Sequence, residues 1–324
     1  MTRRTFLRAA CAAAVPASLG LPALAQPAAW PARPVRVIVP FGAGSGNDIV
    51  ARLMGDHLGR ALGQPIVVDN RVGANGSIGA DAVARSAPDG YTLFVTTNTT
   101  QAANPALMKK LNYDPIKDFA PIGRIANTPA MLVVNPSLPV RNLQELITLA
   151  KSRPGKLTYA SGSAGTLVPA AMLTHMAGID MLHVPYKTIP PALNDVVAGQ
   201  VDMMFTDMAT GMPQVKGGKV RAIGVSSLQP VASLPDVPPI AATIKGFELL
   251  AWYAMYAPAG TPTPIIERLS RELQAAVNHP GLRERLASLG LQPVSSTPQE
   301  LADFSRSELA RWGQLIRSAG IEPE

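Results

Sequence analysis

Cysteine is almost absent from this chain of 324 residues, which contains only Cys11. Because Cys11 lies within a predicted export signal, the mature chain has no thiol for a disulfide, a nucleophile or a Cys-based metal site. Histidine is also scarce, and the four histidines lack metal-ligand spacing. We interpret all of them as structural: His57, His175, His183 and His279. The sequence therefore predicts no metal, and the lack of an intact cofactor motif predicts no cofactor.

Charged residues are few as well. Asp, Glu, Lys and Arg make up 16% of the chain, and the formal net charge is +7. Three arginines lie in the predicted export signal, so the mature chain is less basic still. The chain has no Lys/Arg run and no aromatics interleaved with basic residues, which argues against a nucleic-acid partner. With 47% hydrophobic residues the chain can bury a large core, and its length predicts two domains.

The first 25 residues have the pattern of an export signal. TRRTFL, at residues 2–7, matches a twin-arginine motif, and a short, alanine-rich apolar stretch follows at residues 9–21. That stretch is too short to span a bilayer. ALA at residues 23–25 is a cleavage site, so the mature chain should begin near Gln26. These features predict a periplasmic protein exported by the twin-arginine route.

The rest of the chain alternates between strand and helix patterns. Apolar runs predict strands at residues 35–39, 66–69, 92–96, 131–134, 157–160, 181–184, 201–205 and 220–225. Helical spacing predicts helices at residues 49–62, 78–85, 143–151, 167–176, 192–198 and through most of 264–319. This order is typical of two α/β units, each with a mostly parallel sheet.

Two similar passages predict how the chain crosses between the units. The segments that begin at Ala130 and Tyr253 share a plan of strand, proline turn and helix. We interpret them as two crossings, with the C-terminal helices packing back on the first unit. Lobe 1 would then be discontinuous, made of residues 26–127 and 253–324, with lobe 2 formed by residues 128–252. A cleft between two lobes is a common place for a ligand.

The first glycine-rich turn is a candidate anion site. Gly42, Gly44 and Gly46 follow the strand at residues 35–39, and Asn47 or Asp48 can cap the helix expected from residue 49. Free N–H groups and the helix dipole at such a turn attract an anion. We expect a bulky side chain at Gly44 to fill the space that a ligand needs.

Two other interpretations of this turn remain open. The glycines can serve only a tight turn, which ranks second to a small-anion site. A dinucleotide site ranks third, because the Rossmann fingerprint needs glycine where this chain has Asn47, although Asp69 lies at about the spacing of the ribose-binding acid.

A second glycine-rich turn, at residues 161–166, also joins a strand to a helix, expected from about Leu167. A third candidate loop at residues 96–100 carries uncharged donors, and the carboxyl ends of parallel strands bring such loops together. A nucleophile elbow at Ser163 would need glycine at position 161, and a triad would need a pair such as Asp207 and His279, which nothing in the local sequence favours. We therefore do not expect catalysis.

Taken together, these segments resemble the Bordetella-uptake-gene-type family, the periplasmic substrate-binding proteins of tripartite tricarboxylate transporters. The resemblance covers essentially the whole mature chain. It is carried by RPVRVIVPFGAGSGNDIVAR, GQPIVVDNRVGANGSIGA, PDGYTL, NYDPIKDFAPIG, LVVNPSLPV, ELITLAKSRPGKLTYASGSAGT, HVPYK, GQVDMMF, LPDVPP and YAPAGTP.

The resemblance implies an α/β, type II periplasmic binding protein fold with two lobes that close on a ligand in the cleft. It implies a small organic carboxylate or amino acid as ligand, and membrane transporter subunits as partners. The carboxylate would be held by N–H groups, hydroxyls and ordered water rather than by an arginine. The chain departs from the family pattern at Ser45, Gly46, Asn47, Pro169, Leu173 and Thr188, where we place the ligand's far end.

We predict that one set of residues contacts the ligand: Phe41, Ala43, Gly44, Ser45, Gly46, Asp48, Thr97, Asn98, Ser161, Ser163, Gly165, Thr166, Tyr186 and Asp207. Asp48 is also open to interpretation as a helix cap, or as a partner for a ligand ammonium group. The predicted function is a monomeric solute receptor, not an enzyme. The alternatives are an exported serine hydrolase using Ser163 and a sensory binding protein that passes its liganded form to a membrane kinase.

Overall fold

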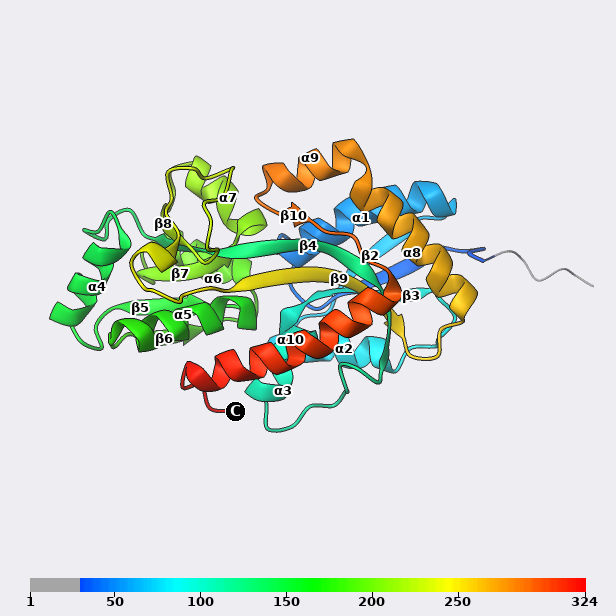
Figure 1. The fold of residues 1–324 in the computed structure, drawn as a ribbon, viewed down its shortest axis with the longest axis horizontal. Helices are drawn as coiled ribbons and strands as arrows, with labels where there is room; N and C mark the ends of the chain where they lie inside the picture. The colour runs from blue at the N-terminus through cyan, green and yellow to red at the C-terminus, as the bar shows by residue number, and fades with distance from the viewer. Residues whose placement is uncertain (1–29) are drawn as a thin grey trace, which may run out of the picture.

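Two long antiparallel strands run along the molecule and join its two lobes (Figure 1). A computed structural model describes residues 30–324, so the predicted export signal and its cleavage site lie outside the described residues. The two strands are β4 (Phe119–Val134) and β9 (Leu250–Pro258). They pair from Phe119 opposite Pro258 to Pro129 opposite Leu250.

Lobe 1 contains the strands at the blue end of the chain. The sheet order here is β2-β1-β3-β9-β4, with β1, β2 and β3 parallel and β9 antiparallel to β3. The strands are β1 (Val35–Val39), β2 (Ile66–Asn70), β3 (Thr92–Thr97) and the short β10 (Gln292–Pro293), which pairs with β4. The helices are α1 (Gly46–Leu62), α2 (Ser77–Ala84), α3 (Asn104–Leu107), α8 (Thr263–Asn278), α9 (Pro280–Ser288) and α10 (Pro298–Ser318).

Lobe 2 continues the sheet from the far end of β4. There β4 pairs antiparallel with β7 and β8, and β5 lies parallel between β7 and β6. The strands are β5 (Thr158–Ser161), β6 (Leu182–Pro185), β7 (Met203–Asp207) and β8 (Arg221–Val225). The helices are α4 (Leu143–Ser152), α5 (Ala164–Ala177), α6 (Ile189–Val197) and α7 (Met208–Lys216). The predicted strands and helices are present in both lobes in the predicted order, with α3, α7 and β10 as additional elements. The exact lobe boundaries stay a prediction because β4 and β9 run through them.

Three sequence expectations are wrong in detail. The strand predicted at residues 131–134 is the end of the 16-residue β4. Pro121 and Pro129 hid the rest, because proline normally marks a strand edge or end. Helix α7 was missed, since Pro213 lies inside it. The helical tail is divided into α8, α9 and α10 with β10 between the last two.

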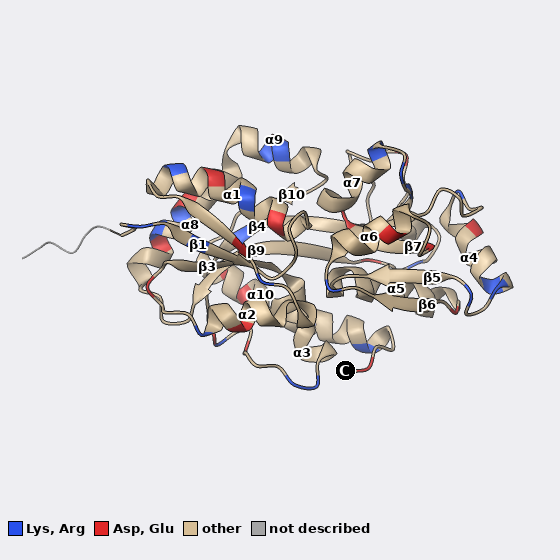
Figure 2. Ribbon diagram, turned by 180° about the vertical axis from the view of Figure 1, so that it is seen from behind, with Lys and Arg blue, Asp and Glu red and all other residues tan. Residues whose placement is uncertain are grey.

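The apolar side chains of β1 are buried by helices on both faces of the sheet, and only Arg36 interrupts the apolar run. Val35, Val37 and Val39 pack into one buried cluster with α1 and α8, whereas Ile38 packs into the other with α2 and α10. Lys and Arg residues are interspersed with Asp and Glu on the outer helices, including α1, α8 and α9 (Figure 2).

Helix α10 is fixed to the crossing strand β9 by one buried acid. Glu308 is 4% exposed, and its Oε2 accepts hydrogen bonds from Nε1 of Trp252 at 2.9 Å and of Trp312 at 3.0 Å. Arg311 pairs with Oε1 of the same carboxylate at 3.1 Å. A second link joins the Tyr256 hydroxyl to Ser305 Oγ at 2.8 Å. Because Trp252 and Tyr256 belong to β9, these contacts hold α10 against one of the two crossing strands.

We predict that Glu308→Leu lowers the free energy of unfolding by about 3 kcal/mol, because it leaves two buried indole N–H groups without an acceptor. Urea unfolding at pH 7 measures the change. Glu267→Leu, at an exposed position on α8, is the control and should change the free energy of unfolding by less than about 0.5 kcal/mol. Equal effects of the two substitutions would contradict the role of Glu308.

Candidate ligand-binding cleft

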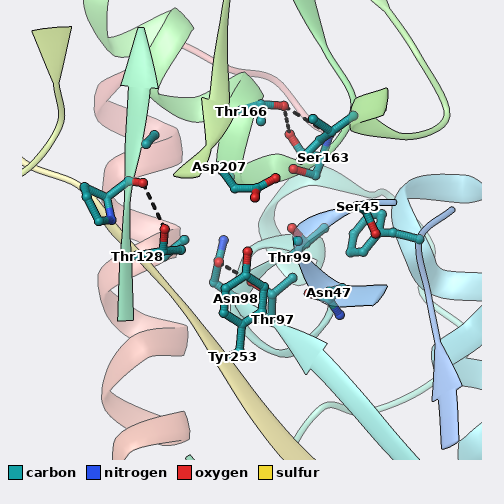
Figure 3. Close-up of a pocket in the computed structure, with 17 residues that line it drawn as sticks. Ser45, Asn47, Thr97, Asn98, Thr99, Thr128, Ser163, Thr166, Asp207 and Tyr253 are labelled. Atoms are coloured by element: carbon teal, nitrogen blue, oxygen red, sulfur yellow. Dashed lines mark hydrogen bonds between the residues drawn. The ribbon is translucent and has the colours of Figure 1, made fainter. Parts of the chain in front are cut away.

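A cavity lies between the lobes, where the loops after β1, β3 and β5 meet the crossing strands (Figure 3). Its volume is about 30 Å³. Seventeen residues line it: Phe41, Ser45, Gly46, Asn47, Thr97, Asn98, Thr99, Thr128, Pro129, Ala130, Ser163, Gly165, Thr166, Ile189, Asp207, Ala251 and Tyr253. None of these lining residues is Lys, Arg or His, and Asp207 is their only carboxylate. The three loops that the sequence singled out therefore meet at one place.

Nine of the fourteen residues predicted to contact ligand line this cavity: Phe41, Ser45, Gly46, Thr97, Asn98, Ser163, Gly165, Thr166 and Asp207. Their contact with a ligand stays a prediction. Sequence reasoning missed Tyr253 and Thr128, which lie on β9 and β4. The repeated passages that begin near both residues predicted the crossings between the lobes, but only the pairing of β4 with β9 places these two side chains at the cavity.

The other five predicted residues lie elsewhere. Ala43 and Gly44 are exposed at the tip of the first loop, and Asp48 faces partners within lobe 1. Ser161 and Tyr186 line a separate cavity of about 570 Å³, which also touches Ser163. None of these five residues is among the described residues that line the smaller cavity.

The first loop is capped by a residue other than those expected. Ser45 is the N-cap of α1, with its Oγ accepting from Asp48 N at 3.4 Å, and the helix begins at Gly46. The expectation that Asn47 or Asp48 caps a helix starting at residue 49 is wrong. Asn47 is already helical, and its Nδ2 donates to Val95 O at 2.9 Å, which ties α1 to β3.

Asp48 holds the first loop in shape. Its carboxylate accepts from Gly44 N–H at 3.0 Å, from Asn70 Nδ2 at 3.0 Å and from two nitrogens of Arg52 at 2.9 and 3.0 Å. Burial would raise the pKa of Asp48, but the hydrogen bonds from Arg52, Gly44 and Asn70 outweigh it and keep that pKa below its usual value. Asp48 is therefore a charged support for the loop.

Of the glycines in the first loop, Gly46 and not Gly44 lies where an added side chain would clash with other residues. A Cβ at Gly44 would meet no atom within 4 Å, so it would lie in open space, and the expectation that a bulky side chain there fills the ligand space stays a prediction. Glycine is favoured at position 44 because φ there is +79°, a conformation that other residues rarely adopt. A Cβ at Gly46 would overlap the Tyr253 hydroxyl and the Asp207 carboxylate. Gly46 thus permits the closest approach between α1 and lobe 2.

The second loop is organised by Thr166. Helix α5 begins at Ala164, three residues earlier than expected, with Ser163 as its N-cap. Thr166 Oγ1 accepts from Gly162 N at 3.0 Å and from Ser163 N at 3.2 Å. Gly165 and Thr166, in the first turn of α5, line the cavity, and the first N–H groups of a helix have no acceptor within it.

Thr188, one of the departures from the family pattern, joins the two lobes. Its Oγ1 accepts from Gly42 N at 3.1 Å, across 146 residues of sequence. Pro169 and Leu173 are buried within α5, and neither lines the cavity. The expectation that these departures surround the far end of the ligand stays a prediction, and the lining of this cavity does not support it for Pro169 and Leu173.

Two buried donors in the cavity have no hydrogen-bond partner among residues 30–324: Asn98 Nδ2 and Thr99 Oγ1. Both side chains are 0% exposed. Asn98 Oδ1 accepts from Thr97 Oγ1 at 2.5 Å, which orients the amide so that Nδ2 faces the cavity (Figure 3). Because buried polar groups are normally paired, these donors mark where ligand atoms would accept hydrogen bonds.

Asp207 is the cavity's acid. Its oxygens accept from Thr210 N at 2.9 Å and Thr210 Oγ1 at 2.8 Å, so it caps α7, and Gly46 N–H also donates to it. Burial raises the pKa of Asp207, against the effect of these hydrogen bonds. Burial and the charge of Asp207 also raise the pKa of the Tyr253 hydroxyl.

The groups needed by a serine hydrolase are not assembled in this cavity. His279, the histidine considered for Ser163, lies between α8 and α9 with its ring 5.3 Å from that of His57. Ser161 Oγ does lie 2.7 Å from His183 Nε2, but within residues 30–324 no carboxylate hydrogen-bonds to His183. Across the described chain, no cluster of three His, Cys, Asp or Glu residues is arranged to hold a metal. The same residues include no helix with the length and apolarity to cross a bilayer.

Two α/β lobes joined by crossing strands around a cleft define the class of periplasmic binding proteins. The structure of the periplasmic binding protein BugD superposes with a TM-score of 0.87 at 35% identity, covering 91% of this chain and 100% of that one. The structure of R. palustris Rpa4515 with adipate gives a TM-score of 0.89 at 34% identity, with the same coverage. The predicted fold class is confirmed.

The family follows from the sequence comparisons. A family model described as "Tripartite tricarboxylate transporter family receptor" matches residues 50–321, and this chain belongs to that family. Protein BugT of Bordetella pertussis is 35% identical over 314 residues, which are 94% of this chain and 95% of BugT. The resemblance inferred from the sequence is confirmed, and the family is one of periplasmic solute receptors.

We predict that Gly46→Ala lowers the free energy of unfolding by about 2 kcal/mol, because the methyl group would force Tyr253 and Asp207 away from α1. Urea denaturation measures it. Gly59→Ala, in the same helix, is the control: its Cβ would make only ordinary contacts, so it should stabilise the protein by about 0.5–1 kcal/mol. A neutral Gly46→Ala would show that the contact between the lobes is loose.

We predict that Asp48→Asn lowers the free energy of unfolding by about 2 kcal/mol at pH 7. Because the folded-state pKa is depressed, this contribution is present above the unfolded pKa of about 3.9 and is lost as the pH falls through the folded value. Urea unfolding at pH 7 and pH 3 checks this. Asp81→Asn breaks only an exposed pair with Arg85 and should cost less than about 0.5 kcal/mol at either pH. A cost for Asp48→Asn that is unchanged at pH 3 would contradict the charge-based role.

Proposed function

We propose that this protein captures a small organic carboxylate in the cleft between its lobes and delivers it to tripartite tricarboxylate-type transporter subunits in the membrane. One observation carries the proposal. Asn98 Nδ2 and Thr99 Oγ1, two buried donors without a hydrogen-bond partner among residues 30–324, lie with the first turn of α5 around a cavity whose described lining includes no basic side chain. Such uncharged donors suit a carboxylate without the cost of desolvating a cation. The relative solved with adipate supports a carboxylate ligand.

Lobe movement is the mechanism that we propose. A volume of about 30 Å³ holds about two water molecules at roughly 10–15 Å³ each, so a dicarboxylate needs the lobes to separate further. The lobes would be residues 26–127 with 253–324, and residues 128–252, hinged at β4 and β9. The contact from Gly42 to Thr188 and that from Gly46 to Asp207 would form on closure. Ligand would shift the population between open and closed forms.

We further infer that the protein acts as a monomer in the periplasm after export by the twin-arginine route. The family supports a periplasmic receptor that works with a transporter. No contact among residues 30–324 favours the hydrolase or the sensory alternative over this function.

A thermal-shift screen tests the proposal. Protein purified from the periplasm is unfolded and refolded to remove any bound molecule, then heated with mono-, di- and tricarboxylates, amino acids and aromatic acids. A ligand at about a hundred times its dissociation constant should stabilise the native state by roughly 2.7 kcal/mol. Stabilisation by one chemical group of acids is expected. No stabilisation by any acid would contradict the proposal.

Thr99→Val tests the site itself. The substitution keeps the shape of the side chain and removes a hydroxyl that has no partner among residues 30–324, so the free energy of unfolding should not fall. Affinity for the ligand identified by the screen should fall about tenfold, as for loss of one hydrogen bond to a charged group. Isothermal titration calorimetry measures it. Thr148→Val, on α4 and exposed, is the control and should bind normally. Normal binding by Thr99→Val would contradict the assignment of this cavity.

A further inference from the structure

Two backbone donors of the first glycine-rich loop are paired with acceptors from lobe 2. Gly42 N donates to Thr188 Oγ1 at 3.1 Å, and Gly46 N donates to the Asp207 carboxylate. Thr188 is the N-cap of α6 and Asp207 is the N-cap of α7, so both acceptors lie where helices of lobe 2 begin. Because each contact spans the cleft, the first loop is held to lobe 2 at two points.

The same loop uses two more of its donors internally. Gly44 N donates to Asp48 Oδ2 at 3.0 Å, and Ser45 N donates to Gly42 O at 3.1 Å. An anion at a helix N-terminus is bound by N–H groups that have no other acceptor. A ligand carboxylate would therefore take one of these donors only by replacing an acceptor that the chain itself supplies.

Asp207 is the stronger of the two acceptors from lobe 2, because hydrogen bonds to a carboxylate are stronger than those to a hydroxyl. Thr210 N and Thr210 Oγ1 donate to it at 2.9 and 2.8 Å, in addition to Gly46 N, and these donors favour the ionised form. The side chain is 9% exposed and projects toward the middle of the residues that line the cavity (Figure 3). Asp207 thus makes with α1 the contact that the sequence predicted for a ligand anion.

We propose that Asp207 and Thr188 are internal competitors of the ligand, which hold the first loop against lobe 2 until a ligand carboxylate replaces them. The inference rests on the proposed function, but it concerns the control of closure and not the identity of the acid. The lobes would close without ligand, and closure by the chain's own acceptors would lower the apparent affinity for an acid. A ligand carboxylate in the same cavity would also be repelled by the charge of Asp207.

An interlobe distance measured without any acid tests the proposal directly. Cys11, in the predicted export signal, is the only cysteine of the chain, so nitroxide labels can be attached after Arg60→Cys on α1 and Lys216→Cys on α7. Both positions are exposed, and they lie in different lobes. The protein is purified from the periplasm and refolded as for the thermal-shift screen. Double electron–electron resonance should show one predominant distance, that of the closed lobes.

Two substitutions remove the acceptors in turn. Asp207→Ser keeps a good N-cap for α7 but is too short to reach Gly46, and Thr188→Val keeps the shape of the side chain without its hydroxyl. The ratio of open to closed molecules should rise about tenfold in Asp207→Ser and about fivefold in Thr188→Val, as for loss of a charged and a neutral hydrogen bond. Circular dichroism verifies the fold. Asn142→Ser, which shortens the N-cap of α4, is the control and should leave the distances unchanged.

Isothermal titration calorimetry with adipate gives a second readout. Asp207→Ser should bind adipate about tenfold more tightly than the unsubstituted protein, because neither the contact with Gly46 nor the like charge opposes the ligand. Where adipate binds to neither protein, the acid that stabilises the protein most in the thermal-shift screen replaces it. Weaker binding by Asp207→Ser would show that Asp207 supports the ligand, and it would overturn the inference.

The outcomes separate this inference from the proposed function. Lobes that are predominantly open in the unsubstituted protein without acid, or equal distances in all the variants, would overturn the inference and leave the proposed function intact. Binding of no acid would instead contradict the proposed function. The distances alone would then decide whether Asp207 and Thr188 hold the lobes closed.

Discussion

β4 and β9 pair as one antiparallel ladder, and both lobes of the molecule are built on it. Phe119 to Pro129 of β4 pair with β9 in lobe 1, and Ala130 to Val134 pair with β7 in lobe 2. Parallel strands present their loops at one edge of a sheet, so a shared ladder turns the loop edges of the two sheets toward each other. The cleft and the contacts across it follow from this pairing. The bridge from Trp252 through Glu308 to α10 then holds the ladder in place.

The electrostatics of the cleft depend on backbone and amide groups. In the first loop the charged pair of Asp48 and Arg52 is used to shape the turn, not to meet a ligand. In the cavity, unpaired donors on one side face a single carboxylate on the other. Uncharged donors bind an anion with little desolvation cost. A single carboxylate discriminates between ligands because it repels those that place a second negative charge beside it. The charges that a ligand in this cavity would need therefore depend on these donors and on Asp207 together.

The loops and their partners show how far sequence reasoning reaches. Glycine spacing after a β-branched strand predicts a strand, turn and helix, because the conformations of β1 and α1 are governed by local residues. The capping residue was predicted wrongly, since Ser45, Asn47 and Asp48 are all good caps and only the contact of Asn47 with Val95 decides among them. Tyr253 and Thr128 line the cavity because β4 pairs with β9, and a local sequence pattern does not specify which distant strands pair.

The sequence by itself determined the family, the order of elements and the loops that meet in the cleft, because each depends on short-range patterns of glycine, hydroxyl and apolar residues. Only the tertiary structure decided that Asp207, not Asp48, is the acid of the cleft. It also decided that a side chain would clash at position 46 and not at position 44. The physical reason is the same in both cases. Charge balance and close approach depend on which residues from separate lobes come within a few ångströms, and that is a property of the folded chain and not of any single segment.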